Sequence, residues 1–189
     1  GVGDRLGYRG IKVGIVSDLV TNRSYLQTYA ESILALQNRS NEINGESRRV
    51  PFIIMTSNDT HDLTVRLLEE NNYFGMDGLS INPTSEEVRA GNVNQIIVLK
   101  QGAVPAVKNN NADFVLDEQN PYRFQEKPHG HGDIHMLIKQ ADIQELFATQ
   151  GITHTVFFQD TNGQVFNVIP AGLGNSVRNN FAMNSLTVP

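Results

Sequence analysis

Short apolar runs that alternate with helical patterns constrain the fold of this chain more than any other feature. Residues 51–55 and 95–100 are largely apolar stretches of strand length, each bounded by polar residues. Apolar residues recur at helical spacing over 24–38 and 60–70. This alternation predicts a layered α/β domain with a largely parallel sheet, in which ligands bind beyond the carboxyl ends of the strands.

The second half of the chain continues the pattern. Asp133 is expected to cap a helical segment that Gly151 stops, and a second helix is expected from Val165. Residues 155–158 and 181–188 are predicted as strands, whereas 108–128 is polar and predicted to be irregular, with a possible short strand at 114–116. The polar segments after strand ends are expected to converge on one edge of the sheet. These segments are 56–58, 101–102 and 159–162.

Composition excludes several classes of protein. The chain has 189 residues, 39% of them apolar, which suits one globular domain. It holds no run of about 18 apolar residues, so the sequence predicts no membrane-spanning helix. With no cysteine, disulfide scaffolds and thiol nucleophiles are excluded. A net charge of -5 without a Lys/Arg cluster argues against a nucleic-acid partner.

Both ends of the sequence lie within patterned segments. Gly1 opens a glycine-rich stretch and Pro189 follows an apolar, strand-like run. We therefore interpret residues 1–189 as part of a domain within a larger protein.

The glycine loop, residues 1–14, is a candidate phosphate site. It holds five glycines together with Arg5 and Lys12, so backbone N–H groups and two cations could meet a polyphosphate. The spacing fits neither a P-loop nor the dinucleotide fingerprint. An ordinary glycine-rich surface turn is the alternative.

A second candidate is the histidine-rich segment 127–135. It contains His129, His131, Asp133 and His135, which resembles a zinc-ligand series, although Ile134 spoils the spacing. A glycine loop that lines a ligand explains Gly130 and Gly132 better. Solvated histidines at the start of a helix are the third interpretation.

Strand ends supply the remaining candidates. Asp160 with Asn162 is typical of a short acidic motif that holds Mg²⁺ against phosphates, and an Asx turn is the simpler alternative. Met55 and Gln101 could pack on and pair with a nucleobase, or serve merely as strand ends.

Taken in order, these motifs resemble the UDP-sugar pyrophosphorylase family, whose members transfer uridylyl groups. The resemblance runs along the whole chain and is weakest at 77–94, which looks like a lineage-specific insertion. It is carried by 3–12 (Gly-Asp-Arg-Leu-Gly-Tyr-Arg-Gly-Ile-Lys), 54–61 (Ile-Met-Thr-Ser-Asn-Asp-Thr-His), 72–76 (Asn-Tyr-Phe-Gly-Met), 127–133 (Lys-Pro-His-Gly-His-Gly-Asp), 157–163 (Phe-Phe-Gln-Asp-Thr-Asn-Gly) and 183–189 (Met-Asn-Ser-Leu-Thr-Val-Pro).

The resemblance implies a Rossmann-like, GT-A-like nucleotidyltransferase domain with a three-layer α/β/α arrangement and a largely parallel mixed sheet. It also implies the reversible reaction of UTP and a sugar 1-phosphate to a UDP-sugar and pyrophosphate, with Mg²⁺. The implied catalytic cations are Lys12 and Arg5. The implied nucleotide contacts are Gly1, Val2, Gly3, Met55, Gln101, Gly130 and Gly132. His131 and Asn162 would lie near the ribose and sugar, and Asp160 would hold Mg²⁺.

Two family features are not found within the 189 residues: the first strand with the start of the glycine loop, expected before Gly1, and the second half of the sugar site with another catalytic lysine, expected after Pro189. We therefore expect the isolated segment to have little or no activity. The family also implies a monomer in the cytoplasm, or in a glycosome or another organelle.

Several alternatives remain open. They are a UDP-glucose or UDP-N-acetylglucosamine pyrophosphorylase, a zinc hydrolase through His129, His131 and His135, and a non-catalytic nucleotide-binding module.

Overall fold

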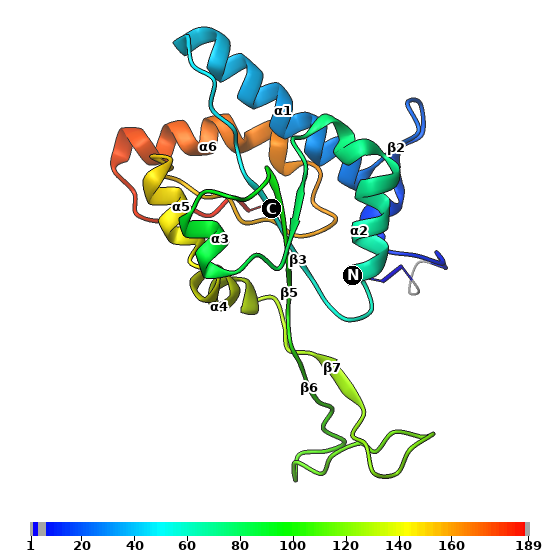
Figure 1. Ribbon diagram of the computed structural model, residues 1–189. Coiled ribbons are helices and arrows are strands. Elements are labelled where there is room, and N and C mark those ends of the chain that lie inside the picture. The colour runs from blue at the N-terminus through cyan, green and yellow to red at the C-terminus, as the bar shows by residue number, and fades with distance from the viewer. Residues whose placement is uncertain (1, 4–6, 188–189) are drawn as a thin grey trace.

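A three-stranded parallel sheet forms the centre of the computed structural model, which describes residues 2–3 and 7–187 (Figure 1). The sheet order is β3 (Phe52–Thr56), β5 (Ile96–Lys100), β4 (Leu79–Ile81). Two small antiparallel pairs lie outside it: β1 (Val16–Asp18) with β2 (Arg23–Ser24), and β6 (Ala103–Pro105) with β7 (Glu126–Pro128). The helices are α1 (Tyr25–Asn44), α2 (His61–Glu70), α3 (Ser85–Arg89), α4 (Asp133–Gln140), α5 (Ile143–Thr149) and α6 (Val165–Asn179), with 3-10 turns η2 (Lys12–Gly14) and η3 (Asn72–Gly75).

The central strand β5 divides the core into two layers. Ile96 and Val98 face a cluster built largely by α1, whereas Ile97 and Leu99 face a cluster completed by α3 and α5. All four side chains are buried, because successive residues of a strand point to opposite faces and both faces carry helices. In Figure 1, α1 and α2 lie on one side of the sheet and α3, α4 and α5 on the other. The predicted three-layer α/β fold is confirmed.

Helix α1 is longer than the predicted 24–38. The hydroxyl of Ser24 accepts the N–H of Gln27 at 3.2 Å, as the expected cap requires. The Gln27 side chain donates to Glu31 instead of returning to the cap, so only half of the capping box forms. The helix ends at Gly45, whose φ of 65° suits glycine. Its last turns are polar and exposed, which left no apolar pattern to reveal them.

Residues 77–94, which the sequence marks as a lineage-specific insertion, are part of the framework of the domain. They contain β4, which pairs with β5 in parallel, and α3, which begins with a capping box between Thr84 and Glu87. The sequence pattern was weak here because β4 has three residues and α3 has five.

Two predicted strands are wrong. Residues 155–158 have no strand partner within 2–3 and 7–187, and their apolar character serves an aromatic cluster in which Phe158 meets Tyr29. Residues 181–187 are not a strand either; Val188 lies outside the described residues. There the Leu186 side chain packs beside Gly172 of α6, and the Asn184 side-chain amide donates to the Gly172 carbonyl.

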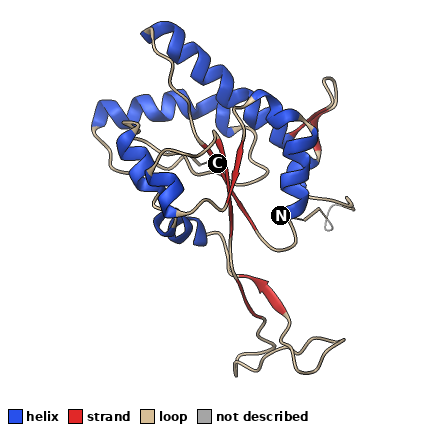
Figure 2. Ribbon diagram, viewed as in Figure 1, coloured by secondary structure: helices blue, strands red, loops and turns tan. Residues whose placement is uncertain are grey.

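The segment predicted to be irregular, 108–128, forms most of a projecting arm with β6 and β7 at its base (Figure 2). Isolated bridges join Val107 to Phe114 and Leu116 to Phe124, so the possible strand at 114–116 is reduced to single pairs. The rings of Phe114 and Phe124 lie 4.9 Å apart between centroids.

The helical segment predicted from Asp133 is two helices. Asp142 has a φ of 55° and separates α4 from α5, and Gly151 with a φ of 66° follows α5. Gly132, and not Asp133, occupies the cap position of α4. Over the described ranges, no helix combines the length and apolar character needed to cross a membrane.

Candidate functional site

A cavity of about 1620 Å³ runs along β3, from residues 47–51 before the strand to Ser57 and Gln101 beyond the carboxyl ends of β3 and β5. Polar residues from three separate parts of the chain reach it: Ser57 after β3, Gln101 after β5, and Asp160. The predicted convergence is therefore confirmed for Ser57 and Gln101, which follow neighbouring strand ends, whereas Asp160 shares the cavity but does not follow a strand. Six predicted site residues line the cavity, namely Met55, Gln101, Gly130, His131, Gly132 and Asp160.

Gln101 joins the sheet to the histidine loop, which we define as residues 129–132. Its backbone N–H donates to the carbonyl of Thr56 at 2.8 Å, which continues the pairing of β5 with β3 by one residue. Its side-chain Oε1 accepts the N–H of Gly130 at 3.1 Å. Two residues predicted as nucleotide contacts are thus in direct contact with each other.

The histidine loop has an open backbone. A Cβ added at Gly130 or Gly132 would meet no other atom within 4 Å, and the φ of Gly130 is 142°, which suits glycine. This fits the interpretation that the glycines leave room for a ligand.

The histidines of this segment do not gather into a metal site. The Nδ1 of His129 lies 2.5 Å from Oδ1 of Asp133. The ring of His135 packs on that of Phe157, with 4.9 Å between the ring centroids. Within the residues that the structure describes, no group of three His, Asp or Glu side chains is placed to hold a metal. The zinc interpretation therefore gains no support.

His61 is a site neighbour that sequence reasoning missed. Its Nδ1 lies 2.9 Å from the hydroxyl of Thr56, at the end of β3. Burial, reinforced by the charge of Lys100, lowers the pKa of His61 and favours the neutral ring. The available signal was a histidine in the first turn of a helix that follows a strand end.

Asp160 is held by an aromatic cluster. The Tyr29 hydroxyl donates to the Asp160 carbonyl at 3.2 Å, and the Tyr29 ring meets Phe158 edge-on, with centroids 5.2 Å apart. Burial raises the pKa of Tyr29, so its hydroxyl stays protonated as a donor. Asp160 is half-buried and lines the cavity. A single carboxylate suits Mg²⁺, which takes its other ligands from phosphates and water.

The glycine loop is folded on itself. Val2 bridges to Ile11, and the N–H of Gly3 donates to the Gly10 carbonyl at 2.7 Å. The ring of Tyr8 fills the space beside Gly3, where an added Cβ would lie 2.8 Å from Cδ1.

Of the residues predicted for phosphate binding, Val2, Gly3 and Lys12 are not among those that line the cavity, although Val13 is. Gly1 and Arg5 lie outside the described residues.

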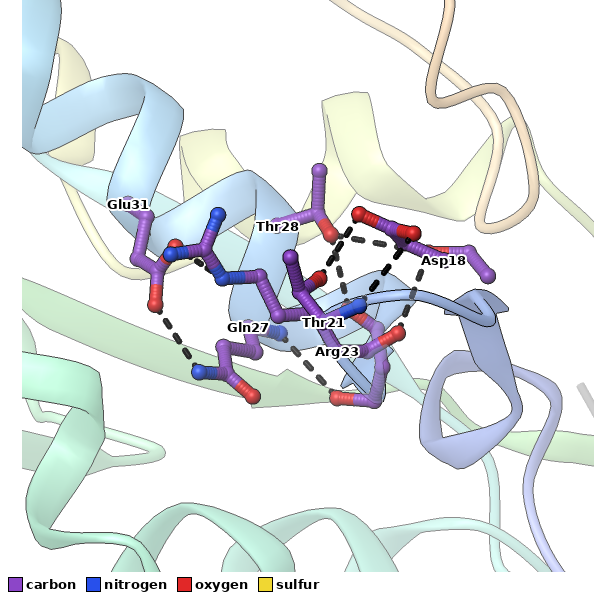
Figure 3. A network of polar contacts seen from close by, with 8 residues as sticks. Asp18, Thr21, Arg23, Gln27, Thr28 and Glu31 are labelled. Carbon is purple, nitrogen blue, oxygen red and sulfur yellow. Dashed lines mark hydrogen bonds and ion pairs between the residues drawn. The ribbon is translucent and has the colours of Figure 1, made fainter.

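Asn162 faces a different place from Asp160. It lines a separate polar pocket of about 310 Å³ together with Asp18 and Arg23. Figure 3 shows the network behind this pocket: the Asp18 carboxylate accepts the Thr21 hydroxyl at 2.7 Å, and Arg23 pairs with Glu31 at 3.1 Å. The expected partnership of Asn162 with Asp160 at one site is not found.

A parallel sheet between two helical layers, with polar residues at its carboxyl edge that reach a cavity, defines an α/β domain of the kind that holds nucleotides. Residues 1–163 match the family described as UTP–glucose-1-phosphate uridylyltransferase. The chain belongs to this family.

Individual relatives sharpen the comparison. A UDP-sugar pyrophosphorylase of Arabidopsis thaliana is 47% identical over all of this chain, which spans 29% of the relative. A UDP-N-acetylglucosamine pyrophosphorylase of Saccharomyces cerevisiae is 26% identical over the whole chain and 35% of the relative. The crystal structure of a uridine diphosphate N-acetylglucosamine pyrophosphorylase from Trypanosoma brucei superposes with a TM-score of 0.57 at 27% identity, over 73% of this chain and 24% of that one. The chain thus spans about a third or less of these proteins.

Proposed function

We propose that this chain carries the nucleotide-binding part of a uridylyltransferase, which makes a UDP-sugar and pyrophosphate reversibly from UTP and a sugar 1-phosphate. The observation that carries the proposal is the contact of Gln101 with Gly130 at the carboxyl edge of the sheet, inside the cavity that Asp160 also lines. Family membership and the 47% identity to a UDP-sugar pyrophosphorylase support the same reaction class.

The base would bind at Gln101. Its Oε1 already accepts the Gly130 N–H, so the amide nitrogen remains as a donor for a ligand. Carbonyl oxygens of uracil are acceptors, which matches this donor. Met55, which also lines the cavity, offers an apolar, polarizable surface for the face of the ring.

Phosphate chemistry would take place towards Asp160. In the proposed step, an oxygen of the sugar 1-phosphate bonds to the α-phosphorus of UTP, the bond to the bridging oxygen breaks, and pyrophosphate leaves with that electron pair. Mg²⁺ bound through Asp160 would supply charge neutralisation and orient the phosphates. Lys12 and Arg5 are proposed as cations for the same charge, and His131 would lie near the ribose and sugar.

The sugar range is proposed to be broad and not restricted to N-acetylglucosamine. The support is the gap between 47% identity to the plant UDP-sugar enzyme and 26% to the yeast N-acetylglucosamine enzyme. We further propose that the protein acts as a monomer in the cytoplasm, and that residues 1–189 alone have little or no turnover.

The decisive experiment is a pyrophosphate-release assay of the full-length protein with UTP, Mg²⁺ and a panel of sugar 1-phosphates. We expect pyrophosphate release with several of the sugars, and none with the sugar phosphate omitted. Binding of UTP without release from any sugar 1-phosphate would instead identify a non-catalytic nucleotide-binding module. Release with only one sugar would exclude the broad range.

A further inference from the structure

A hydrogen bond between His129 and Asp133 closes the histidine loop. His129 Nδ1 lies 2.5 Å from Asp133 Oδ1, and the loop between them consists of Gly130, His131 and Gly132. The Asp133 side chain is 16% exposed, whereas that of His129 is 62% exposed. Because Asp133 is the first residue of α4, the pair ties the start of the loop to a helix.

The loop needs such a restraint. Glycine loses more backbone freedom than any other residue when it becomes ordered, and neither Gly130 nor Gly132 is fixed by packing around its Cα. On one side the chain is held at Pro128, which pairs with Ala103 in the β6–β7 ladder. Between Pro128 and α4, the His129–Asp133 hydrogen bond is a side-chain restraint that spans the whole loop.

We propose that the His129–Asp133 pair is a positioning device for nucleotide recognition, a role that rests on the proposed function. The pair holds Gly130 so that its N–H stays on Gln101 Oε1. That contact fixes which end of the Gln101 amide is offered to the base. Neither His129 nor Asp133 needs to touch the nucleotide, because both act through Gly130 and Gln101.

The consequence is selective. With Gly130 in place, Gln101 offers a donor, which suits the carbonyl oxygens of uracil. When the pair is broken, the loop loosens and the amide can turn to offer its acceptor, which suits the amino group of cytosine. The pair therefore affects both the affinity for UTP and the preference for UTP over CTP.

The first test needs no ligand. In the full-length protein, hydrogen exchange is followed by mass spectrometry on the peptide that spans 129–133, in wild type, His129→Ala and His129→Gln. We expect at least about tenfold faster exchange in His129→Ala, and near-wild-type exchange in His129→Gln, whose amide can still donate to Asp133. Unchanged exchange in His129→Ala would overturn the inference.

The matched control is Arg89→Ala. Arg89 pairs with Asp142 at 2.6 Å with side-chain exposures of 65% and 17%, nearly those of His129 and Asp133, but the pair joins α3 to the cap residue of α5. Exchange at 129–133 should be unaffected by this variant. A rise equal to that in His129→Ala would mean that general loosening explains the effect, and the positioning role would be rejected.

The second test measures binding of UTP and CTP by calorimetry, and KM and kcat by pyrophosphate release. We expect His129→Ala to raise the Kd for UTP about tenfold and to bring the Kd values for UTP and CTP closer together. We also expect a higher KM with little change in kcat, since a ground-state contact is lost. Wild-type Kd values for both nucleotides in His129→Ala would overturn the inference and leave the proposed function standing. Failure of the wild-type protein to bind UTP would overturn the proposed function and the nucleotide role of the pair together.

Discussion

The sheet end of the cavity (Ser57, Gln101 and Gly130) and the glycine loop (residues 1–14) were both expected to bind one nucleotide, yet they are built differently. At the sheet end, hydrogen bonds link β3, β5 and the histidine loop through Gln101. The glycine loop instead bonds to itself, with Gly3 on Gly10 and the Tyr8 ring between its arms. The difference is one of structure: Gln101 links two strands to the histidine loop, whereas the described residues of the glycine loop bond mainly to one another.

The largest effect is expected at Lys12. In the full-length protein, Lys12→Ala should lower kcat by at least about 10²-fold, the scale for losing one group that stabilises transition-state charge. Steady-state pyrophosphate release measures it. The control is Lys108→Ala on the arm, which should leave kcat unchanged. Wild-type turnover in Lys12→Ala would mean that the glycine loop takes no part in the chemistry, and the comparison of the two regions as parts of one site would fail.

Gly3→Ala tests how tightly the glycine loop is closed. The new Cβ would lie 2.8 Å from the Tyr8 ring and 2.9 Å from the Tyr8 carbonyl oxygen, so the loop must shift at a cost of about 1–3 kcal/mol. Chemical denaturation should report this loss in the free energy of unfolding. Gly174→Ala, with open space around its Cβ position in α6, should not destabilise the protein. Equal stabilities for the two variants would argue that the loop is not closed as described.

Gln101→Ala tests the sheet end. It removes the proposed base donor and leaves the Gly130 N–H without its acceptor, so the Kd for UTP should rise about tenfold. Calorimetry gives the Kd, and the exposed Gln144→Ala variant in α5 serves as control. An unchanged Kd would mean that the base binds elsewhere.

The smallest effect concerns pH. The folded state lowers the pKa of His61, so the unfolded chain binds the proton first as pH falls below about 6.5. Stability should therefore decrease as the pH drops from about 7 towards 5, and His61→Gln should flatten that part of the curve. Denaturation curves at several pH values measure it. A slope that survives in His61→Gln would assign the pH dependence to other groups.

Much of the framework could be predicted because parallel strands buried on both faces are continuous apolar runs. The runs at 51–55 and 95–100 appear as β3 and β5 with a shift of one residue at most ends. Because β3 and β5 were predicted to be parallel, Ser57 and Gln101, which follow them, could be expected at the same edge of the sheet. Apolar residues at 155–158 misled the prediction, because periodicity cannot distinguish a paired strand from a segment that fills an aromatic cluster.

The position of Gln101 was predictable because a true strand end precedes it, whereas Asp160 reaches the cavity although no strand precedes it. Gln101 and Asp160 reach the cavity as expected, whereas Asn162, two residues beyond Asp160, turns into a second pocket. The contact between His129 and Asp133 depends on the turn of the loop into α4, a geometry that residue spacing does not encode. Thr56 and His61 likewise meet only because α2 folds back beside β3.

The outer edge of β3 has a consequence for handling the protein in solution. Within the described ranges, β3 pairs with β5 on one side only, and its other side borders the largely apolar cavity. Unpaired backbone donors and acceptors beside apolar side chains are a template for strand addition by another chain. Concentrated samples of these 189 residues should therefore self-associate edge to edge.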